Sequence, residues 1–311
     1  MSVLDAIGNT SLVRLRRFAP ANGAELWVKL EGENPTGSMK DRMAAAVISR
    51  AEADGRLAPG GTVVEYTGGS TGTSLAFVCA AKGYRARIVT SDAFSPEKRD
   101  HMAALGAELT IVPSEGGLTT KKLILDMVEA ARALSREPGS FFTNQLENAD
   151  AVEGYRPLGE EILSGLGSVD AFVHSVGTAA SIRGVASVLK GRDASTKVVA
   201  VEPAESSVLL GGTPGPHKIE GVGIGYLPPL WDPSAVDGIE AVPTAEAKET
   251  ARRLAREEGL FAGTSTGANV VAALRVAARL GPGARVVTLA CDSGLKYLST
   301  DVYRGSPGRT A

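Results

Sequence analysis

The chain has 311 residues, enough for one large domain or two of ordinary size. Its residues are 43% hydrophobic and 22% charged, and the formal net charge is −2 at pH 7. This balance gives no electrostatic reason to expect a nucleic-acid partner, and no apolar run approaches the length of a membrane span. We therefore expect neither nucleic acid nor membrane as a partner. We also expect no signal peptide, because the N-terminus has no basic segment that leads into an apolar run.

Two residue types add to this description. Cys79 and Cys291 lie far apart in the sequence, and neither has a CxxC or His-rich neighbourhood. We therefore expect a reduced, cytoplasmic protein without a metal site. Glycine is in excess, with 37 residues that gather in short loops between apolar runs, which indicates tight turns and close approach of a ligand.

The first notable element is the segment NPTGSMKDR, residues 34–42. A turn containing Pro and Gly leads into a helix, for which Ser38 and Asp41 predict a capping box. Lys40 then falls in the first helical turn, where the macrodipole disfavours a positive charge. Two interpretations are open: Lys40 is a solvated surface residue, or its amine is held uncharged so that it can react.

Further along the chain, short β-rich runs alternate with helical patterns. The predicted strands are residues 62–67, 85–91, 171–175, 198–203 and 285–293. After the first of them, Leu75, Val78 and Cys79 share one face of a helix that Gly83 is expected to end. Segments 113–117 and 211–218 are predicted loops. The alternation predicts the α/β class, with parallel sheets covered by helices.

Three loops rich in glycine and hydroxyl side chains lead into helices. They are EYTGGSTGTS (65–74), SVGTAASIRG (175–184) and AGTSTGAN (262–269). Helix N-termini carry unpaired N–H groups that bind carboxylates or phosphates, although each loop taken alone can also be an ordinary capped turn. Together with Lys40, the loops fit one ligand that needs both a phosphate site and an amine nucleophile. Pyridoxal phosphate meets both needs.

Six segments also resemble the cysteine synthase family, the O-acetylserine sulfhydrylases. They are IGNTSLVRL, NPTGSMKDR, EYTGGSTGTSLA, GPHKIEGVGIGYLPP, AGTSTGAN and CDSGLKYLST, in family order from Ile7 to Thr300. The family belongs to fold type II of the pyridoxal-phosphate enzymes, together with cystathionine β-synthase and the serine/threonine dehydratases. The resemblance implies two three-layer αβα domains with mostly parallel sheets, as in the tryptophan synthase β chain. Residues 38–146 would form a smaller domain with the substrate loop, and residues 1–37 and 147–311 a larger domain that binds the cofactor phosphate.

The resemblance also implies roles for individual residues. Lys40 corresponds to the lysine that forms a Schiff base with pyridoxal phosphate, and Ser265 to the serine that hydrogen-bonds the pyridine nitrogen. The residues that correspond to the phosphate loop are Gly177, Thr178, Ala179, Ala180 and Ser181. The residues implied in substrate binding are Thr67, Gly68, Gly69, Thr71, Gln145 and Gly221. Ser70 occupies the position beside the cofactor's phenolic oxygen.

The reaction implied is a β-replacement on an O-activated serine, in which Lys40 removes the α-proton and a small nucleophile takes the place of the β-substituent. With O-acetylserine and sulfide, the products are cysteine and acetate. The alternatives are a cystathionine β-synthase-type or specialised-metabolism β-substituted alanine synthase, a serine/threonine dehydratase, and a catalytically lapsed scaffold of the same fold. The resemblance further implies a homodimer, and the tail of a serine acetyltransferase as a docking partner.

The sequence departs from the family pattern at several positions. Ser70 stands where the family's TSGNTG has asparagine, Gly68 replaces a serine, and Tyr66 replaces a proline. Ala179 and Ala180 replace two glycines of the phosphate loop GTGGT. Alanine is tolerated there only with φ below zero, which is the backbone that we therefore expect at both positions. For Ser70 the open alternative is that it only caps the helix that follows.

Overall fold

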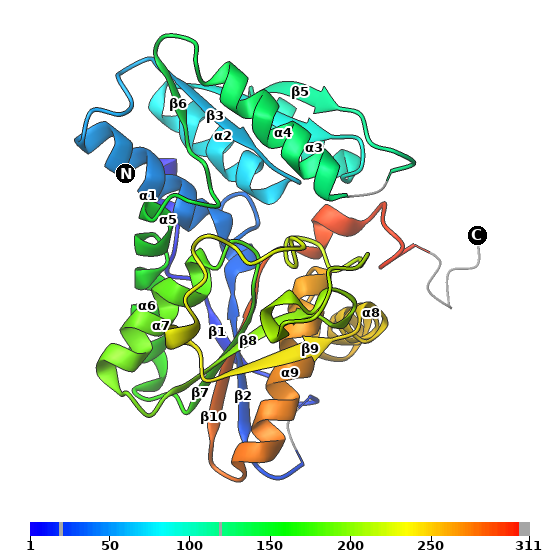
Figure 1. The fold of residues 1–311 in the computed structure, drawn as a ribbon. Helices are drawn as coiled ribbons and strands as arrows, with labels where there is room; N and C mark the ends of the chain where they lie inside the picture. The colour runs from blue at the N-terminus through cyan, green and yellow to red at the C-terminus, as the bar shows by residue number, and fades with distance from the viewer. Residues whose placement is uncertain (19–20, 118–119, 305–311) are drawn as a thin grey trace. The chain divides into compact units, whose positions relative to one another are not determined.

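The computed structural model describes residues 1–18, 21–117 and 120–304. The chain forms two compact units, which can be followed in Figure 1. The first unit consists of Met1–Ile7 and Asn34–Gly154, and the second of Gly8–Glu33 and Tyr155–Ala311. Residues 1–7, 34–37 and 147–154, which the resemblance assigns to the larger domain, therefore belong to the first unit.

The first unit is built on a four-stranded sheet in the order β5-β4-β3-β6, in which every neighbouring pair is parallel. Its strands are β3 (Thr62–Tyr66), β4 (Arg85–Ser91), β5 (Glu108–Val112) and β6 (Ser140–Phe142). Its helices are η1 (Val3–Ala6), α1 (Lys40–Ala53), α2 (Ser70–Lys82), α3 (Pro96–Ala104), α4 (Lys121–Leu134) and α5 (Asp150–Glu153). The long helix α4 contacts all four strands, whereas α2 contacts β3 and β4 and packs in turn on α1 and α3. Because β3 is buried at every residue, it has the character of a strand covered on both faces.

The second unit is built on a six-stranded sheet in the order β1-β2-β10-β7-β8-β9, in which β1 is antiparallel to β2 and the other pairs are parallel. Its strands are β1 (Leu12–Arg14), β2 (Glu25–Leu30), β7 (Ala171–Ser175), β8 (Lys197–Pro203), β9 (Gly238–Val242) and β10 (Arg285–Ala290). Its α-helices are α6 (Arg156–Leu166), α7 (Ala180–Arg192), α8 (Thr244–Arg253) and α9 (Thr264–Leu280). The short helical turns are η2 (Glu31–Glu33), η3 (Ala204–Ser206), η4 (Val208–Leu210), η5 (Pro233–Ala235), η6 (Leu254–Glu258, a π-helix) and η7 (Gly294–Tyr297).

The connections of the second unit place its helices on both faces of the sheet. The crossover from β7 through α7 to β8 moves in one direction along the sheet, and the path from β9 through α8 and α9 to β10 returns in the other. Since such crossovers are right-handed, α7 and α9 cover opposite faces. The chain changes direction between the neighbouring strands β7 and β10, and ligands of open α/β sheets bind at the carboxyl ends of strands at such a point.

The secondary structure confirms the α/β class. Each of the five predicted strands is present, as β3, β4, β7, β8 and β10. Leu75, Val78 and Cys79 are fully or almost fully buried on α2, and Gly83 ends this helix with φ of 78°. Segment 211–218 is a loop, as predicted. The Val, Ala, Phe and Leu residues of β7, β8 and β10 are buried on both faces of the sheet, which explains why these strands are mostly apolar and do not alternate with polar residues.

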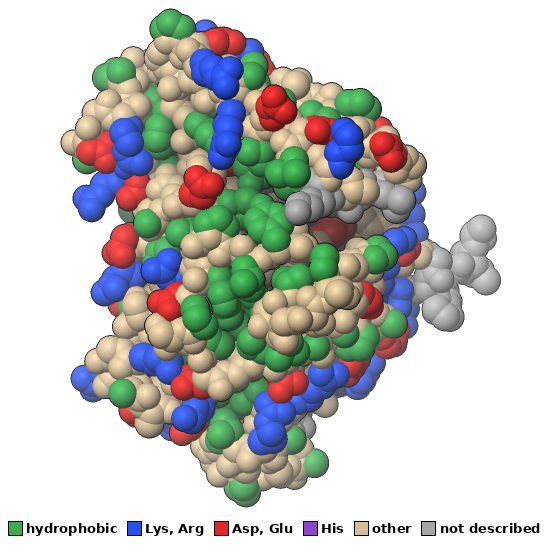
Figure 2. Space-filling model, viewed as in Figure 1, with side chains coloured by type: hydrophobic (Ala, Val, Ile, Leu, Met, Phe, Trp, Pro, Cys, Tyr) green, Lys and Arg blue, Asp and Glu red, His purple; other side chains and the backbone are tan. Residues whose placement is uncertain are grey.

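The surface and the cysteines complete the description. On the face shown in Figure 2, acidic and basic side chains are interspersed. None of the helices in the described part of the chain has the length and apolar character needed to cross a membrane. Residues 1–18, 21–117 and 120–304 contain no group of three or more His, Cys, Asp or Glu side chains suited to hold a metal ion. Both cysteines are buried thiols, and burial raises the pKa of Cys79 to about 12.

Candidate active site

Lys40 is the first residue of α1, as the sequence predicts. The predicted capping box is wrong, because the N-cap position is Met39 and no side chain caps the helix there. Asp41 instead accepts hydrogen bonds from the backbone N–H and the hydroxyl of Thr36, at 2.8 and 2.6 Å, and these two donors occupy both carboxylate oxygens. Lys40 is half-buried at the positive end of the helix dipole, which is an unfavourable place for an ammonium charge.

The turn before Lys40 is connected to helix α2 of the same unit. The hydroxyls of Thr36 and Ser74 lie 3.3 Å apart, and both side chains are buried. Ser74 is one helical turn after Ser70, at the N-terminal end of α2. The helix starts of α1 and α2 are therefore held together by a buried polar contact.

The 67–71 loop joins β3 to α2, and two glycines shape it. A Cβ atom on Gly68 would stand 2.8 Å from the ring of Phe94, and one on Gly69 would stand 2.3 Å from the Lys98 side chain. Gly69 also has φ of +150°, a backbone that side chains disfavour. The replacement of the family's serine by Gly68 thus has a physical reason, since Phe94 fills the space that a larger residue would need.

Gln145 lies next to this loop, because it follows β6 and β6 is the parallel neighbour of β3. Its side-chain oxygen accepts a hydrogen bond from the Thr71 hydroxyl at 2.7 Å, and its side-chain nitrogen donates to the Tyr66 carbonyl at 2.9 Å. Thr67, Gly68, Gly69, Thr71 and Gln145 are therefore gathered at the carboxyl ends of two neighbouring strands. Ser70 begins α2 at the same place, and the N-cap position is Gly69, so the interpretation of Ser70 as the helix cap is wrong.

Glu65, in the buried strand β3, is a residue that the sequence interpretation missed. Its carboxylate accepts hydrogen bonds from the backbone N–H groups of Tyr66 and Gln145, both at 2.9 Å, and from the Thr143 hydroxyl at 2.6 Å. Burial raises the pKa of Glu65 to about 7. An acidic residue inside an otherwise apolar strand, TVVEYT, was the available signal, because buried carboxylates need specific partners.

In the second unit, residues 177–181 follow β7 and run into the first turn of α7, which begins at Ala180. The Thr178 hydroxyl accepts a long hydrogen bond, 3.4 Å, from the Ala180 N–H. Ser181 lies in the first turn of α7, and its hydroxyl is 2.8 Å from Nε2 of His174. The N–H groups of this helix start and the hydroxyls of Thr178 and Ser181 provide donors of the kind that bind phosphate.

The backbone of this loop differs from the expectation at one position. Ala179 has φ of 70° and ψ of −5°, in the left-handed region, so the expectation of negative φ is wrong for this residue. Ala180 is the first residue of α7 and keeps the helical backbone, as expected. The turn into α7 requires a left-handed residue at position 179, and alanine there costs about 1–2 kcal/mol relative to an unstrained residue.

This strain predicts different stabilities for two matched variants. Ala179→Gly and Ala180→Gly each remove one buried methyl group and each make the unfolded chain more flexible, but only Ala179→Gly relieves a left-handed alanine. Ala179→Gly should therefore be the more stable of the two by about 1–2 kcal/mol in urea unfolding. Equal free energies of unfolding for the two variants would contradict the left-handed assignment.

The segment around Gly221 packs on the 177–181 loop. A Cβ atom on Gly177 would stand 2.5 Å from the Gly221 carbonyl oxygen, so the two loops are in close backbone contact. Gly223 donates its N–H to the Val176 carbonyl at 3.0 Å. The segment GVGIGY (221–226), which lacks the spacing of a dinucleotide site, thus packs against the loop that leads into α7.

Ser265 belongs to the same group of residues in the second unit. It is the second residue of α9 and is buried. Its neighbour Thr264 accepts a hydrogen bond from the Glu220 N–H at 3.1 Å, which joins the start of α9 to the Gly221 segment. Gly177, Gly221 and Ser265 therefore lie on segments that contact one another directly or through a single hydrogen bond.

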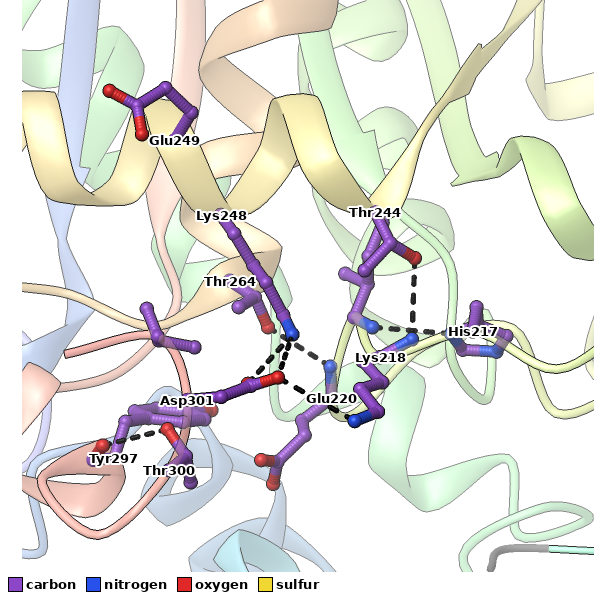
Figure 3. A network of polar contacts seen from close by, with 12 residues as sticks. His217, Lys218, Glu220, Thr244, Lys248, Glu249, Thr264, Tyr297, Thr300 and Asp301 are labelled. Carbon is purple, nitrogen blue, oxygen red and sulfur yellow. Dashed lines mark hydrogen bonds and ion pairs between the residues drawn. The ribbon is translucent and has the colours of Figure 1, made fainter. Parts of the chain in front are cut away.

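Figure 3 shows what holds the chain just before Gly221. Lys218 donates its backbone N–H to the Thr244 hydroxyl at 3.3 Å, and its side chain lies 3.5 Å from Asp301. Lys248 from α8 forms an ion pair with the same carboxylate at 2.7 Å. The hydrogen bond from Lys248 lowers the pKa of Asp301. Asp301 therefore connects α8, the 217–221 segment and the segment that follows η7.

Two open α/β units define the class of this protein: one has a lysine at a helix start, and the other has a hydroxyl-rich helix start beside its switch point. The class is that of the pyridoxal-phosphate enzymes of fold type II. The sequence profile of the family described as "Pyridoxal-phosphate dependent enzyme" matches residues 3–292. The chain belongs to this family and, within it, to the cysteine synthases. Pyridoxal phosphate is accordingly its cofactor.

Individual relatives are similar over nearly the whole chain. The cysteine synthase of Staphylococcus aureus (strain Mu50 / ATCC 700699) is 41% identical over 305 residues, which cover 97% of this chain and 96% of that protein. The crystal structure of O-ureido-L-serine synthase has a TM-score of 0.92 and 38% identity, over 99% of this chain and 96% of that one. The cysteine synthase from Entamoeba histolytica has a TM-score of 0.92 and 34% identity, over 99% of this chain and 92% of that one. The predicted family and fold are confirmed.

Proposed function

We propose that this protein is a cysteine synthase, which replaces the acetoxy group of O-acetylserine with sulfide and releases cysteine and acetate. The observation that carries the proposal is the likeness to a cysteine synthase over 97% of the chain. The geometry within each unit supports it. A half-buried lysine begins α1, and a loop suited to bind a carboxylate lies between β3 and α2.

The residues of the second unit fit the phosphate and ring of pyridoxal phosphate. The loop before α7 has no room for a side chain at Gly177, and it ends at a helix start with N–H and hydroxyl donors. We assign the phosphate to Gly177, Thr178, Ala179, Ala180 and Ser181. Ser265 would present a neutral hydroxyl to the pyridine nitrogen. When bound, the cofactor supplies an electron sink that stabilises negative charge at the substrate α-carbon.

The residues of the first unit would bind the amino acid and move its proton. Thr67, Gly68, Gly69, Thr71 and Gln145 would hold the α-carboxylate through backbone N–H groups and polar side chains, with Gly221 of the second unit as a further substrate contact. Lys40 would bond the cofactor aldehyde and then take the proton from the substrate α-carbon, which requires its amine to be uncharged. Ser70 would donate to the phenolic oxygen. We further propose that the 38–146 part supplies the substrate loop and the rest of the chain the cofactor phosphate site.

A second β-replacement reaction has specific support. The O-ureido-L-serine synthase structure matches this chain as well as a cysteine synthase structure does, with a TM-score of 0.92 for each. If this protein catalyses such a reaction, the nucleophile that replaces the β-substituent is a compound other than sulfide. Ser70, which replaces the family's asparagine beside the reacting groups, is the residue that we expect to influence this preference.

A direct assay separates these functions. The purified holoprotein should absorb visible light as a lysine-bound pyridoxal cofactor does, and it should form cysteine from O-acetylserine and sulfide. Parallel reactions with homocysteine or hydroxyurea in place of sulfide test the other synthase activities, and ammonia release from serine alone tests a dehydratase. A colourless protein that gives no product in any reaction would indicate a lapsed scaffold and would contradict the proposal.

The proposal extends to the location, the oligomeric state and a protein partner. We expect a cytoplasmic homodimer, with the tail of a serine acetyltransferase as an additional partner. Light scattering on the purified protein measures the oligomeric state directly. A monomer at micromolar concentration would contradict the first of these expectations.

Replacing Ser70 with alanine tests the clearest departure from the family. Because Ser70 is the first helical residue and Gly69 is the cap, Ser70→Ala should change the melting temperature little. Its turnover should fall on the order of tenfold, since one neutral hydrogen bond is worth about 0.5–1.5 kcal/mol, and the visible spectrum of the bound cofactor should shift. Ser70→Asn is the matched variant, and it should move the preference towards O-acetylserine and sulfide. A lower melting temperature with unaltered spectrum and turnover would contradict this role.

A further inference from the structure

A line of three polar side chains, Ser181, His174 and Asn269, runs inward from the start of α7 in the second unit. Ser181 Oγ is 2.8 Å from His174 Nε2, and His174 Nδ1 is 3.4 Å from the side-chain nitrogen of Asn269. His174 is at the end of β7, and Asn269 is on α9, one helical turn after Ser265. His174 and Asn269 are 2% and 0% exposed, so the contact between these two side chains is shielded from competing solvent, whereas Ser181 is half-buried.

The surroundings of Asn269 determine which way its amide points. Its oxygen accepts the Ser175 N–H at 2.7 Å, a role that only the oxygen can fill. The amide nitrogen therefore faces the other way, where it donates to the Leu289 carbonyl at 2.9 Å and approaches the Cys291 sulfur at 3.4 Å. The amide nitrogen is also the atom that faces His174, so Asn269 presents a donor to that ring.

The orientation of Asn269 favours one tautomer of His174, because the amide N–H that does not bind Leu289 is directed between His174 Nδ1 and the Cys291 sulfur, each 3.4 Å from the amide nitrogen. A ring nitrogen that faces an N–H donor must accept, so Nδ1 carries no proton. The proton of the neutral ring is then on Nε2, and this N–H donates to Ser181 Oγ. Because the Ser181 oxygen accepts from the ring, its own hydrogen has to point in another direction, away from His174.

We propose that His174, held as the Nε2–H tautomer by Asn269, is a positioning residue that makes the Ser181 hydroxyl a donor to the cofactor phosphate. This inference rests on the proposed function, because the phosphate is that of pyridoxal phosphate on residues 177–181. A hydroxyl that rotates freely donates to the phosphate only part of the time. When the oxygen of the Ser181 hydroxyl accepts the His174 N–H, the hydroxyl hydrogen is already directed away from His174 before the phosphate binds. Asn269 also connects this hydroxyl to the helix that carries Ser265.

The tautomer can be measured without any substitution. The chain has only three histidines, His101, His174 and His217, so a sample labelled with ¹⁵N at histidine gives few ring signals. Two-bond ¹H–¹⁵N spectra of the holoprotein, with His174→Gln used to assign the signals, should show a protonated Nε2 and an unprotonated Nδ1 for His174. A proton on Nδ1, or on both nitrogens, at pH 8 would overturn the inference.

A double-mutant cycle tests whether His174 acts through Ser181. The affinity of the apoprotein for pyridoxal phosphate is measured by absorbance titration for His174→Leu, Ser181→Ala and the double variant, with unfolding curves for each. His174→Leu should weaken binding by about threefold to tenfold in the wild-type background and by nothing further in the Ser181→Ala background. His174→Gln, whose amide can still donate near Nε2, should remain close to wild type.

The outcomes also separate this inference from the proposed function. Equal weakening by His174→Leu with and without the Ser181 hydroxyl would overturn the positioning role and leave the proposed function intact. Unchanged affinity in His174→Leu would do the same. Failure of the wild-type apoprotein to bind pyridoxal phosphate would overturn the proposed function and this inference together.

Discussion

Lys40→Ala is expected to lower the rate of cysteine formation by at least about 10³-fold, because we propose that Lys40 is both the nucleophilic amine and the general base, and this variant would lose both in one change. The protein should still fold. Lys40 is the first residue of α1 and is only half-buried, and alanine is well tolerated in a helix. The visible absorption band that depends on the covalent bond to lysine should disappear, while residues 177–181, which we propose as the phosphate loop, should still bind the cofactor.

The control for Lys40→Ala is Lys122→Ala. The Lys122 side chain is 75% exposed on α4, where it forms an ion pair with Asp126 at 2.6 Å. Its loss should leave turnover, spectrum and melting temperature nearly unchanged. Borohydride reduction of the wild-type holoprotein followed by peptide mapping should place the pyridoxyl group on Lys40. A label on Lys29, Lys98 or Lys296, or an active Lys40→Ala protein, would contradict the assignment.

The strands and the α/β class could be predicted from the sequence because their signal is local. The runs in β3, β4, β7, β8 and β10 are rich in β-branched and small apolar residues, and helical patterns separate them. The position of Lys40 at a helix start could be predicted for the same reason. The N-terminal cap of that helix could not be predicted, because the path of the preceding turn brings Thr36, and not Ser38, to the Asp41 carboxylate.

The details of the candidate site were less accessible because they depend on contacts between distant segments. Phe94 and Lys98 explain the two glycines at 68 and 69, but nothing local in the sequence shows that α3 approaches this loop. The left-handed backbone of Ala179 follows from the turn between β7 and α7, and alanine gives no sign of it. Glu65 and His174 were overlooked because a single polar residue within a buried strand looks like an exception to the pattern. Glu65 in fact binds the segment that follows the neighbouring strand β6, and His174 contacts the start of the helix that follows its own strand, β7.

Glu65 leads to the second prediction with a large effect, which concerns the pH dependence of stability. Burial raises the pKa of Glu65 from 4.5 to about 7 in the folded protein. Between these two values the folded state holds a proton that the unfolded state has released, so the folded state binds more protons. The free energy of unfolding should therefore fall as the pH rises from about 4.5 to about 7, and the contribution of this residue is about 3 kcal/mol.

The hydrogen bonds around Glu65 show how both of its protonation states are accommodated. The ionised carboxylate accepts from Thr143 at 2.6 Å and from the Gln145 N–H at 2.9 Å. The Thr143 hydroxyl also lies 3.2 Å from the Val64 carbonyl. When Glu65 is protonated, it can donate to Thr143, whose hydroxyl then donates to Val64. The ionised form binds the Gln145 N–H more strongly, since hydrogen bonds to charged acceptors are the stronger ones.

Glu65→Gln removes the titration while it keeps the size of the side chain. The amide has one acceptor oxygen for three donors, so this variant should be less stable than wild type at pH 5, where the wild-type residue is mostly neutral. As the pH rises from 5 to 8, the wild type loses most of the stability contributed by its proton and the variant does not, so the difference between them should shrink by about 2.5 kcal/mol. Urea unfolding of both proteins at several pH values between 5 and 8 measures this difference. Parallel pH profiles for the two proteins would show that Glu65 does not titrate in this range and that its carboxylate is ionised throughout.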